Sequence, residues 1–521
     1  MDFSKQYIKQ NVSKANAFSQ VTVDDDYVVK DNKPDVVRII RADGRVKIEE
    51  TKVGNQAIWI SGKLEFEVLY KSDDTGNKMD AFCGAVILQE KMYVEGLEEF
   101  DNVSVTGTID DLTIGIINSR KLAIRAVLNF VVGGEENREE MIVSGIESYD
   151  KNFMAPVTKV EEKEILCLKK EQKDTLRVKE MIMIPNTKSN IREIVSYDVD
   201  VRGLEYYGEE HRVEMRGEAF LCVIYRNEEG QLEWYDASIP FSGYFDAEGC
   251  KASDLYYVKV LSKEYGLEII GDNDGEMRAL ELELLFSVDM RCWEEVSVPV
   301  LMDAYALDRN LVLEKEPMNF KKLLVKNTAK LRLNENFQVD DAEEKILQIC
   351  SYHGKVCVEH TEVVENGLEV LGIVTVYVMY ATPEDGFPMA CVSGQLAFEQ
   401  VVDVPGLKKE DCFYLECGLD QLQVNLLDSS EYEAKVSIKI DVMAFGTEMI
   451  ERVINMEEIP LDGNGLQDYP GIVAYIPWEE EALWDIAKKF KTTVEEIKEN
   501  NGLKSENVKK GEKLLIVKQV D

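Results

Sequence analysis

The chain has 521 residues, 45% of them hydrophobic, and a formal net charge of −39 at pH 7. This length predicts three to four domains, each with a core of its own. The strong negative charge argues against a basic face for nucleic acid or anionic lipid, and it is compatible with a basic protein partner.

Targeting signals and disulfides are not expected. Residues 1–20 carry no continuous apolar run of the kind that a signal peptide has, and no stretch approaches the ~20 apolar residues that span a bilayer. The ten cysteines are scattered, mostly within apolar strands, and none forms a Cys-x-x-Cys pair. They are therefore predicted to be reduced core residues of a cytosolic protein.

One stretch of nine residues occurs three times along the chain. Residues 62–70, 217–225 and 372–380 start 155 positions apart, and apolar side chains alternate along each copy. A period of two predicts a strand. Because the opposite face is also largely apolar in the second and third copies, this strand is expected at the centre of its sheet, covered on both sides.

The rest of each copy predicts further strands and a short helix. A strand is expected to open each copy, and then Val36, Ile39 and Ile40 and their counterparts follow at i, i+3, i+4, which predicts one or two helical turns. Turns rich in Asp, Gly and Glu come after the central strand, at 72–76, 227–230 and 383–386. Each copy closes with a half-solvated strand.

These patterns predict a mainly β protein with three tandem β-sandwich or barrel-like repeats of about 155 residues, followed by a small βααβ domain. Repeats of this size are expected to be separate domains rather than turns of a solenoid. The expected boundaries are 1–150, 151–310 and 311–462 for the repeats, 463–470 for a linker, and 471–519 for the last domain.

The C-terminal pattern is strand, helix, helix, strand. Residues 472–476 predict a strand, and Leu483, Ile486, Ala487 and Phe490 fall on one face of a helix. Thr492 is expected to cap a second helix, with Glu495 reaching back to complete a capping box. That helix is expected to stop near Gly502, before a closing strand at 514–517.

This layout resembles the LysM domain. The matching residues are Leu483-Trp484-Asp485-Ile486-Ala487, Ile497 with Asn501, and Gly511 with Leu514 and Ile516. LysM domains usually bind N-acetylglucosamine polymers such as peptidoglycan, between the loop before the first helix and the loop after the second. The family has Gly-Asp-Thr before Leu-Trp, and this chain has Glu480, Glu481 and Ala482 there. Glu480 brings bulk and charge where a glycine lets a sugar approach the backbone.

The groove is therefore predicted to bind a protein, with peptidoglycan as the alternative. The residues expected to line it are Ile476, Trp478, Glu480, Glu481, Trp484, Asn501, Gly502 and Leu503. Trp484 is either a core residue beneath the first helix or an aromatic anchor at the interface.

Three large β repeats before one LysM domain resemble the SipL family of spore-coat morphogenetic proteins, whose repeats are called SPOCS domains. Lys33-Pro34-Asp35-Val36 and Ile239-Pro240-Phe241 resemble that family's motifs, and the third copy departs with Glu343-Glu344-Lys345. The resemblance implies a scaffold or adaptor of the mother-cell cytoplasm. Its LysM domain would dock on the coat morphogenetic ATPase, stage IV sporulation protein A, and tether the coat to the forespore surface.

No catalytic residue, metal site or cofactor is expected. Of the three histidines, His353 and His360 lie near Cys357, but His360 and Cys357 would face opposite sides of a strand. Gly-x-Ser-x-Gly, P-loop and His-Glu-x-x-His motifs are missing from the sequence, and no pair stands out among 99 carboxylates. The chain is therefore not expected to be an enzyme. A LysM-targeted wall hydrolase would need a catalytic domain that the repeats do not resemble.

Overall fold

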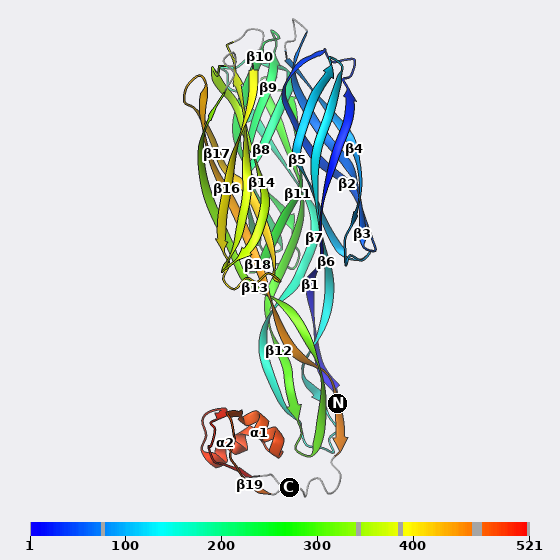
Figure 1. Ribbon diagram of the computed structural model, residues 1–521, viewed down its shortest axis with the longest axis vertical. Helices are drawn as coiled ribbons and strands as arrows, with labels where there is room; N and C mark the ends of the chain where they lie inside the picture. The colour runs from blue at the N-terminus through cyan, green and yellow to red at the C-terminus, as the bar shows by residue number, and fades with distance from the viewer. Residues whose placement is uncertain (1, 74–78, 340–344, 384–388, 461–470, 518–521) are drawn as a thin grey trace.

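The protein forms an elongated body with a broad head, a narrow stalk and a small domain beside the far end of the stalk (Figure 1). The computed structural model describes residues 2–73, 79–339, 345–383, 389–460 and 471–517. Head and stalk consist of six three-stranded sheets, two from each repeat.

Each repeat contributes six strands in the same order. The first has β1 (Asp2–Val28), β2 (Val36–Gly54), β3 (Ala57–Ser72), β4 (Met79–Tyr93), β5 (Asn102–Asn118) and β6 (Lys121–Ser148). The second has β7 (Val157–Met183), β8 (Ile191–Glu209), β9 (Arg212–Asn227), β10 (Leu232–Asp246), β11 (Leu255–Ile270) and β12 (Ala279–Tyr305). The third has β13 (Arg309–Gln338), β14 (Gln348–Val364), β15 (Gly367–Ala381), β16 (Met389–Asp403), β17 (Cys412–Leu426) and β18 (Glu431–Pro460).

The repeated nine-residue stretch is the central strand of one sheet in every repeat, as predicted. The sheet orders are β2-β3-β4, β8-β9-β10 and β14-β15-β16, so β3, β9 and β15 each have a partner on both sides. The tyrosine that ends the stretch is fully buried in all three copies. The Tyr70 hydroxyl donates to the carbonyl of Pro34 at 3.1 Å, and the Tyr225 hydroxyl lies 3.5 Å from the carbonyl of Ser189, the corresponding residue. The mainly β fold class is confirmed.

The short helix predicted in each repeat is wrong. Val36, Ile39 and Ile40 lie in β2, whose pairing with β3 shifts register between Val36 and Arg38 and again between Ile39 and Arg41. Such bulges insert a residue into the strand, so the side chains that point inward are spaced by three or four instead of two. The second repeat has the same shifts in β8, and the apolar spacing there imitates a helix for the same reason.

The repeats pack around a common axis through equivalent residues, a contact that the sequence left open. Arg41 and Ser196, which are 155 positions apart, meet at 3.3 Å between guanidinium Nη2 and hydroxyl Oγ. The next residues on the same face also meet, with His353 Nδ1 lying 2.7 Å from Asp198 Oδ2 and His353 Nε2 3.8 Å from Asp43 Oδ1. The three repeats are thus related by a pseudo-threefold axis that is lined with charged and polar side chains.

The stalk is made of three long antiparallel strand pairs with an apolar interior, β1 with β6, β7 with β12 and β13 with β18. Its core residues are Ile8, Ile142, Ile165, Val298, Val300, Met318, Phe320 and Ile450. Below the broad part of the head, Asn11 accepts a bond from Trp293 Nε1 at 2.9 Å and donates to Glu135 at 3.0 Å. Glu135 also accepts from the Tyr414 hydroxyl at 2.7 Å and pairs with Arg291 at 3.2 Å. This network, here called the junction cluster, ties all three repeats together.

The C-terminal domain has the predicted βααβ order. It contains β19 (Ile472–Tyr475), β20 (Glu481–Ala482), α1 (Leu483–Phe490), α2 (Val494–Asn501), β21 (Asn507–Val508) and β22 (Leu514–Val517). The antiparallel pair β19 and β22 packs against the helices. The capping box of α2 lies one residue later than predicted, with Thr493 and Glu496 in place of Thr492 and Glu495. Gly502 ends α2 in the left-handed conformation, at φ 65°, as expected.

Some predictions fall wholly or partly on residues that the structure does not describe. These are the linker at 463–470, residues 343–344, and parts of the turns at 72–76 and 383–386. The domain boundaries stay a prediction. All ten cysteines are free thiols, but Cys83 is exposed, so the expectation that all ten are core residues is wrong for it.

Candidate partner-binding site

The two loops that should form the groove lie against each other at one side of the C-terminal domain. Strands β20 and β21 join them in antiparallel pairing, and the Leu483 amide donates to the carbonyl of Glu506 at 2.7 Å. Across this seam, the Asn507 side-chain amide lies 3.4 Å from the carboxylate of Glu480. Glu481 is turned inward and accepts a bond from the Tyr475 hydroxyl at 2.9 Å. Of the two glutamates, Glu480 is therefore the one presented to solvent.

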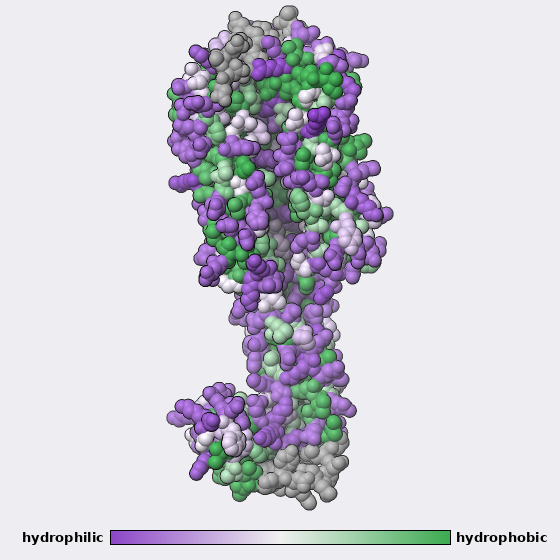
Figure 2. Space-filling view, viewed as in Figure 1, coloured by the Kyte–Doolittle hydropathy of each residue, from purple (hydrophilic) through white to green (hydrophobic). Residues whose placement is uncertain are grey.

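The predicted residues Ile476 and Trp478 belong to an exposed apolar surface. Trp478 is 84% exposed and Ile476 47% exposed. Ile472 and Leu515 are also exposed, on the outer face of the β19–β22 pair. Hydrophobic residues gather at this lower end of the domain in Figure 2. Exposed apolar side chains gathered on one part of a domain are typical of interaction sites.

Three predicted site residues serve the domain's own structure. The side-chain amide of Asn501 donates to the carbonyls of Leu515 and Ile497 at 2.7 and 2.8 Å, and its oxygen accepts from the Leu515 amide at 2.6 Å. Gly502 caps α2, and Leu503 packs against the domain core. Their polar groups and apolar surface are already used within the domain.

Trp484 contacts the stalk, which neither of the two sequence readings foresaw. Its indole Nε1 donates to Asp303 Oδ2 at 2.8 Å, and its ring meets Tyr305 edge to face at a centroid distance of 4.9 Å. Asp303 and Tyr305 lie at the end of β12. Lys488, one turn after Trp484 on α1, reaches both oxygens of Asp303 at 2.8 Å. The face of α1 that carries these side chains is thus occupied by the protein's own second repeat.

Further bonds hold the domain at this place. Tyr305 is 2% exposed, joins the core of the C-terminal domain, and donates its hydroxyl to the carbonyl of Thr492 at 2.9 Å. Lys491 donates to the carbonyls of Ala306 and Arg309 at 3.1 and 2.8 Å. Burial acts to raise the pKa of Asp303, but the bonds from Lys488 and Trp484 outweigh it and hold that pKa below its usual value.

Two family models match the chain. One, described as SipL, SPOCS domain, matches residues 35–117, 190–270 and 345–427, and a LysM domain model matches residues 479–517. The chain therefore contains three SPOCS domains of the SipL type and a C-terminal LysM domain. No curated protein and no solved structure matches it.

The SPOCS matches cover the four middle strands of each repeat and leave out the long first and last strands, which extend into the stalk. The first match spans β2 to β5, and the other two span the corresponding strands, β8 to β11 and β14 to β17. Both families are binding domains without catalytic residues. Neither helix in the described part of the chain, each eight residues long, has the length that a bilayer span requires.

No local pattern in the sequence indicated the contact between the LysM domain and the stalk. Asp303 and Trp484 are 181 positions apart, and Asp303 is one of 99 acidic residues. The residues that were missed are Asp303, Tyr305, Lys488 and Lys491.

A group of thiols and carboxylate in the second repeat resembles a metal site but has a structural use. Ligand atoms of Cys250, Asp254 and Cys292 lie within 4.8 Å of one another. Asp254, however, accepts the Lys251 amide at 2.8 Å and so closes a turn. Equivalent turn bonds, at 2.7 and 2.9 Å, are accepted in the other repeats by Asp101 and Asp411. Burial raises the pKa of the Cys292 thiol, which disfavours the thiolate that a metal needs.

Proposed function

We propose that this protein is a non-enzymatic scaffold or adaptor in the assembly of the bacterial spore coat. Its LysM domain docks on the coat morphogenetic ATPase, stage IV sporulation protein A, and so tethers the coat to the forespore surface from the mother-cell cytoplasm. The observation that carries the proposal is the combination of three SPOCS matches in one head with a LysM domain held at the opposite end of the stalk.

The surface of the LysM domain supports a protein partner. Its exposed side carries Trp478, Ile476 and the carboxylate of Glu480, while Trp484 is committed to the stalk. A large exposed aromatic beside charge is typical of the anchors that dominate protein interfaces. Glu480 stands where a sugar-binding LysM domain has a glycine, so it narrows the approach of a glycan to the backbone.

The contacts between the repeats support a scaffold. Arginines and carboxylates from different repeats pair with one another, Arg291 with Glu135 at 3.2 Å and Arg41 with Asp198 at 3.9 Å. Buried groups that satisfy one another in this way hold repeats together, which is what an assembly platform needs.

The test is binding of the full-length chain to the purified coat ATPase, measured by biolayer interferometry. The full chain is needed because Tyr305 contributes to the core of the LysM domain. Trp478→Ala should weaken binding about tenfold or more, since truncating an interface tryptophan commonly removes 2 kcal/mol or more. Phe100→Ala is the matched control, because Phe100 is a 96% exposed aromatic on the head. Loss of binding in the control variant, or no binding by the wild type, would contradict the proposal.

The second candidate is a peptidoglycan-binding protein of the spore envelope, favoured by the LysM match itself. Sedimentation with insoluble peptidoglycan tests it. If Glu480 hinders the glycan, Glu480→Gly should increase the pelleted fraction over the wild type. A wild-type chain that sediments with peptidoglycan and does not bind the ATPase would favour this candidate.

A further inference from the structure

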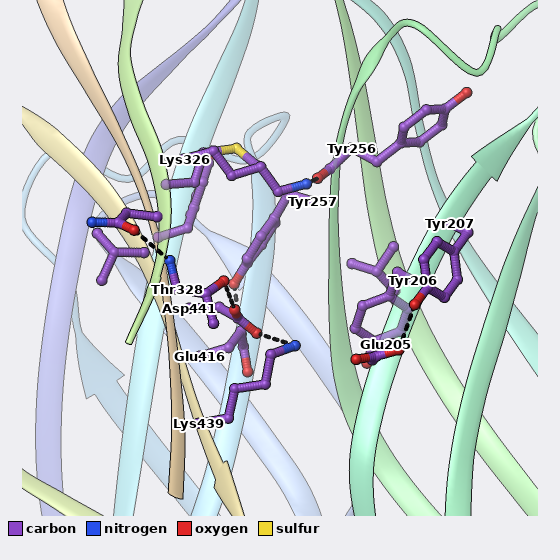
Figure 3. Close-up of a pocket in the computed structure, with 15 residues that line it drawn as sticks. Glu205, Tyr206, Tyr207, Tyr256, Tyr257, Lys326, Thr328, Glu416, Lys439 and Asp441 are labelled. Carbon is purple, nitrogen blue, oxygen red and sulfur yellow. Dashed lines mark hydrogen bonds and ion pairs between the residues drawn. The ribbon is translucent and has the colours of Figure 1, made fainter. Parts of the chain in front are cut away.

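A pocket of about 220 Å³ opens between the second and third repeats, on the head and away from the LysM domain (Figure 3). Its walls come from β8 and β11 on one side and from β13, β17 and β18 on the other. Aromatic side chains are concentrated here, and they are Tyr206, Tyr207, Tyr256, Tyr257 and Tyr414. The volume is suited to one side chain or one small molecule.

One carboxylate in the pocket lacks a counter-charge. Glu416 accepts a hydrogen bond from the Tyr257 hydroxyl at 2.7 Å, and among the described residues no lysine or arginine nitrogen lies within ion-pair distance of it. Lys259 and Lys263 attract the Glu416 carboxylate electrostatically, but only from beyond ion-pair distance. Burial raises the pKa of Glu416, since a carboxylate removed from water without a cation disfavours its charged form.

The two lysines of the pocket are bonded elsewhere. Lys439 pairs with Asp441 at 3.0 Å, and Asp441 also accepts from the Thr328 hydroxyl at 2.5 Å. Lys326 points to the carbonyl of Tyr256 at 3.4 Å, and burial lowers its pKa. The lining therefore has an unneutralised acid beside tyrosine side chains, as Figure 3 shows for Glu416 and the hydroxyl of Tyr257.

The tyrosines of β8 are peculiar to this repeat. The residues 155 positions before and after Tyr206 are Thr51 and Thr361, and those around Tyr207 are Lys52 and Glu362. The two other repeats thus form the same fold with a threonine in the place of Tyr206. The aromatic lining is a property of this one junction and is not required by the architecture.

We propose that the pocket between the second and third repeats binds a guanidinium or ammonium group on an aliphatic chain. Such a cation pairs with the carboxylate of Glu416 and rests against the faces of the tyrosines. Both interactions, the ion pair and the cation–π contact, strengthen when the site is shielded from water. Arg216, whose guanidinium lies 5.1 Å from the Tyr207 ring centroid, already makes a contact of this kind with one of the lining tyrosines. The net charge of −39 raises the local concentration of cations around the protein. The group can belong to a free polyamine or to a basic polypeptide.

Isothermal titration calorimetry of the full-length chain tests this with agmatine, spermidine and an end-blocked triarginine peptide. Saturable one-to-one binding of at least one of them is expected. Preference for agmatine or spermidine indicates a free amine, and preference for the peptide indicates a polypeptide. A chitin oligosaccharide is the comparison ligand, and its binding in place of the cations would overturn the proposal.

Two variants of the pocket should each weaken binding about tenfold. Glu416→Gln removes the charge and keeps the shape, and Tyr206→Thr installs the residue that the other repeats have. Thr is already accommodated at that position twice, so the second variant keeps the test decisive if the first fails to fold. Glu50→Gln, the counterpart of Glu205 in the first repeat, removes one charge elsewhere and should leave binding unchanged. Equal weakening by Glu50→Gln, or no effect of either pocket variant, overturns the proposal.

Discussion

The contacts between the repeats differ in kind from the contact between the stalk and the LysM domain. Arg291 and Arg41, which join repeats, have side chains 5% and 6% exposed and pair with several carboxylates. The LysM domain is held by Asp303, 15% exposed, with Lys488, which is 40% exposed. Removing one partner of a buried pair strands the other charge without water, whereas at an exposed pair water replaces the partner. The repeats should therefore depend on one another for folding, and the LysM domain should detach without unfolding them.

Arg291→Ala in the junction cluster should destabilise the protein most. It leaves Glu135 and Glu171 buried without their cation, which lowers the free energy of unfolding by about 3–5 kcal/mol. A large fall in the thermal midpoint of the head is expected by circular dichroism. Arg177→Ala is the control, because Arg177 pairs with Glu283 at 2.9 Å on the surface and is 64% exposed. Its cost should stay below about 1 kcal/mol, and equal costs would mean that the junction cluster is not special.

His353→Gln removes a side chain at the pseudo-threefold axis of the head and should have the second largest effect. It should lower the free energy of unfolding by about 2 kcal/mol, the usual contribution of a hydrogen bond to a charged group. Burial acts to lower the pKa of His353, but Asp198 and Asp43 outweigh burial and Arg41, so that pKa is raised. The stabilisation is therefore full below about pH 6.5, the unfolded value, and is lost as pH rises through the folded value. Urea unfolding at pH 6 and pH 9 should show a cost that shrinks at the higher pH. His360→Gln, at an exposed site, should show no such trend.

Asp303→Ala should weaken the docking of the LysM domain on the stalk by about 1–2 kcal/mol of free energy and leave the head folded. Faster amide hydrogen exchange in α1 and at the end of β12, without change in the head, is the expected sign. Because the pKa of Asp303 is lowered, its contribution is present above about pH 4 and is lost as pH falls through the lowered value. Asp485→Ala, at an exposed position of α1, is the control. Faster exchange throughout the head would show that the domain is not separable.

Gln56→Gly should give the smallest effect, a stabilisation of about 0.5–1 kcal/mol. Gln56 has φ 55° in the hairpin between β2 and β3, and glycine adopts this region without the strain of a Cβ. Asn366 occupies the same place in the third repeat with φ 59°, and asparagine tolerates it better than glutamine. Asn366→Gly should accordingly gain less than Gln56→Gly in urea unfolding. The reverse order would show that the turn is limited by contacts and not by the backbone.

The strands and the LysM order were predictable from sequence because both depend on local periodicity. Alternation placed β3, β9 and β15 at the centre of their sheets, and the spacing of Leu483, Ile486 and Ala487 placed α1. Periodicity failed at β2, where two bulges between Val36 and Arg41 changed the spacing of the buried side chains. A pattern of i, i+3, i+4 over so short a stretch does not distinguish a bulged strand from a helical turn.

The candidate site was predictable only in part, because one side of the LysM domain is shaped by residues from another repeat. The loops and their glutamates followed from the domain pattern, and Trp478 was found exposed. The contact of Trp484 depends on Asp303 and Tyr305, which no local pattern ties to it. The pocket of five tyrosines likewise brings together residues of two repeats, so it became visible only once their packing was known.

Every repeat ends where it begins. The first residue of each repeat's first strand lies opposite the last residue of its last strand, Asp2 with Ser148, Val157 with Tyr305, and Arg309 with Pro460. The chain therefore passes from one copy to the next at the tip of the stalk. A gene that gained or lost a whole copy would still lead the chain to this tip, but the C-terminal domain would dock there only if the second copy, with Asp303 and Tyr305, were kept. The length of the molecule is set by the strand pair of a single repeat, and the number of copies changes only its width.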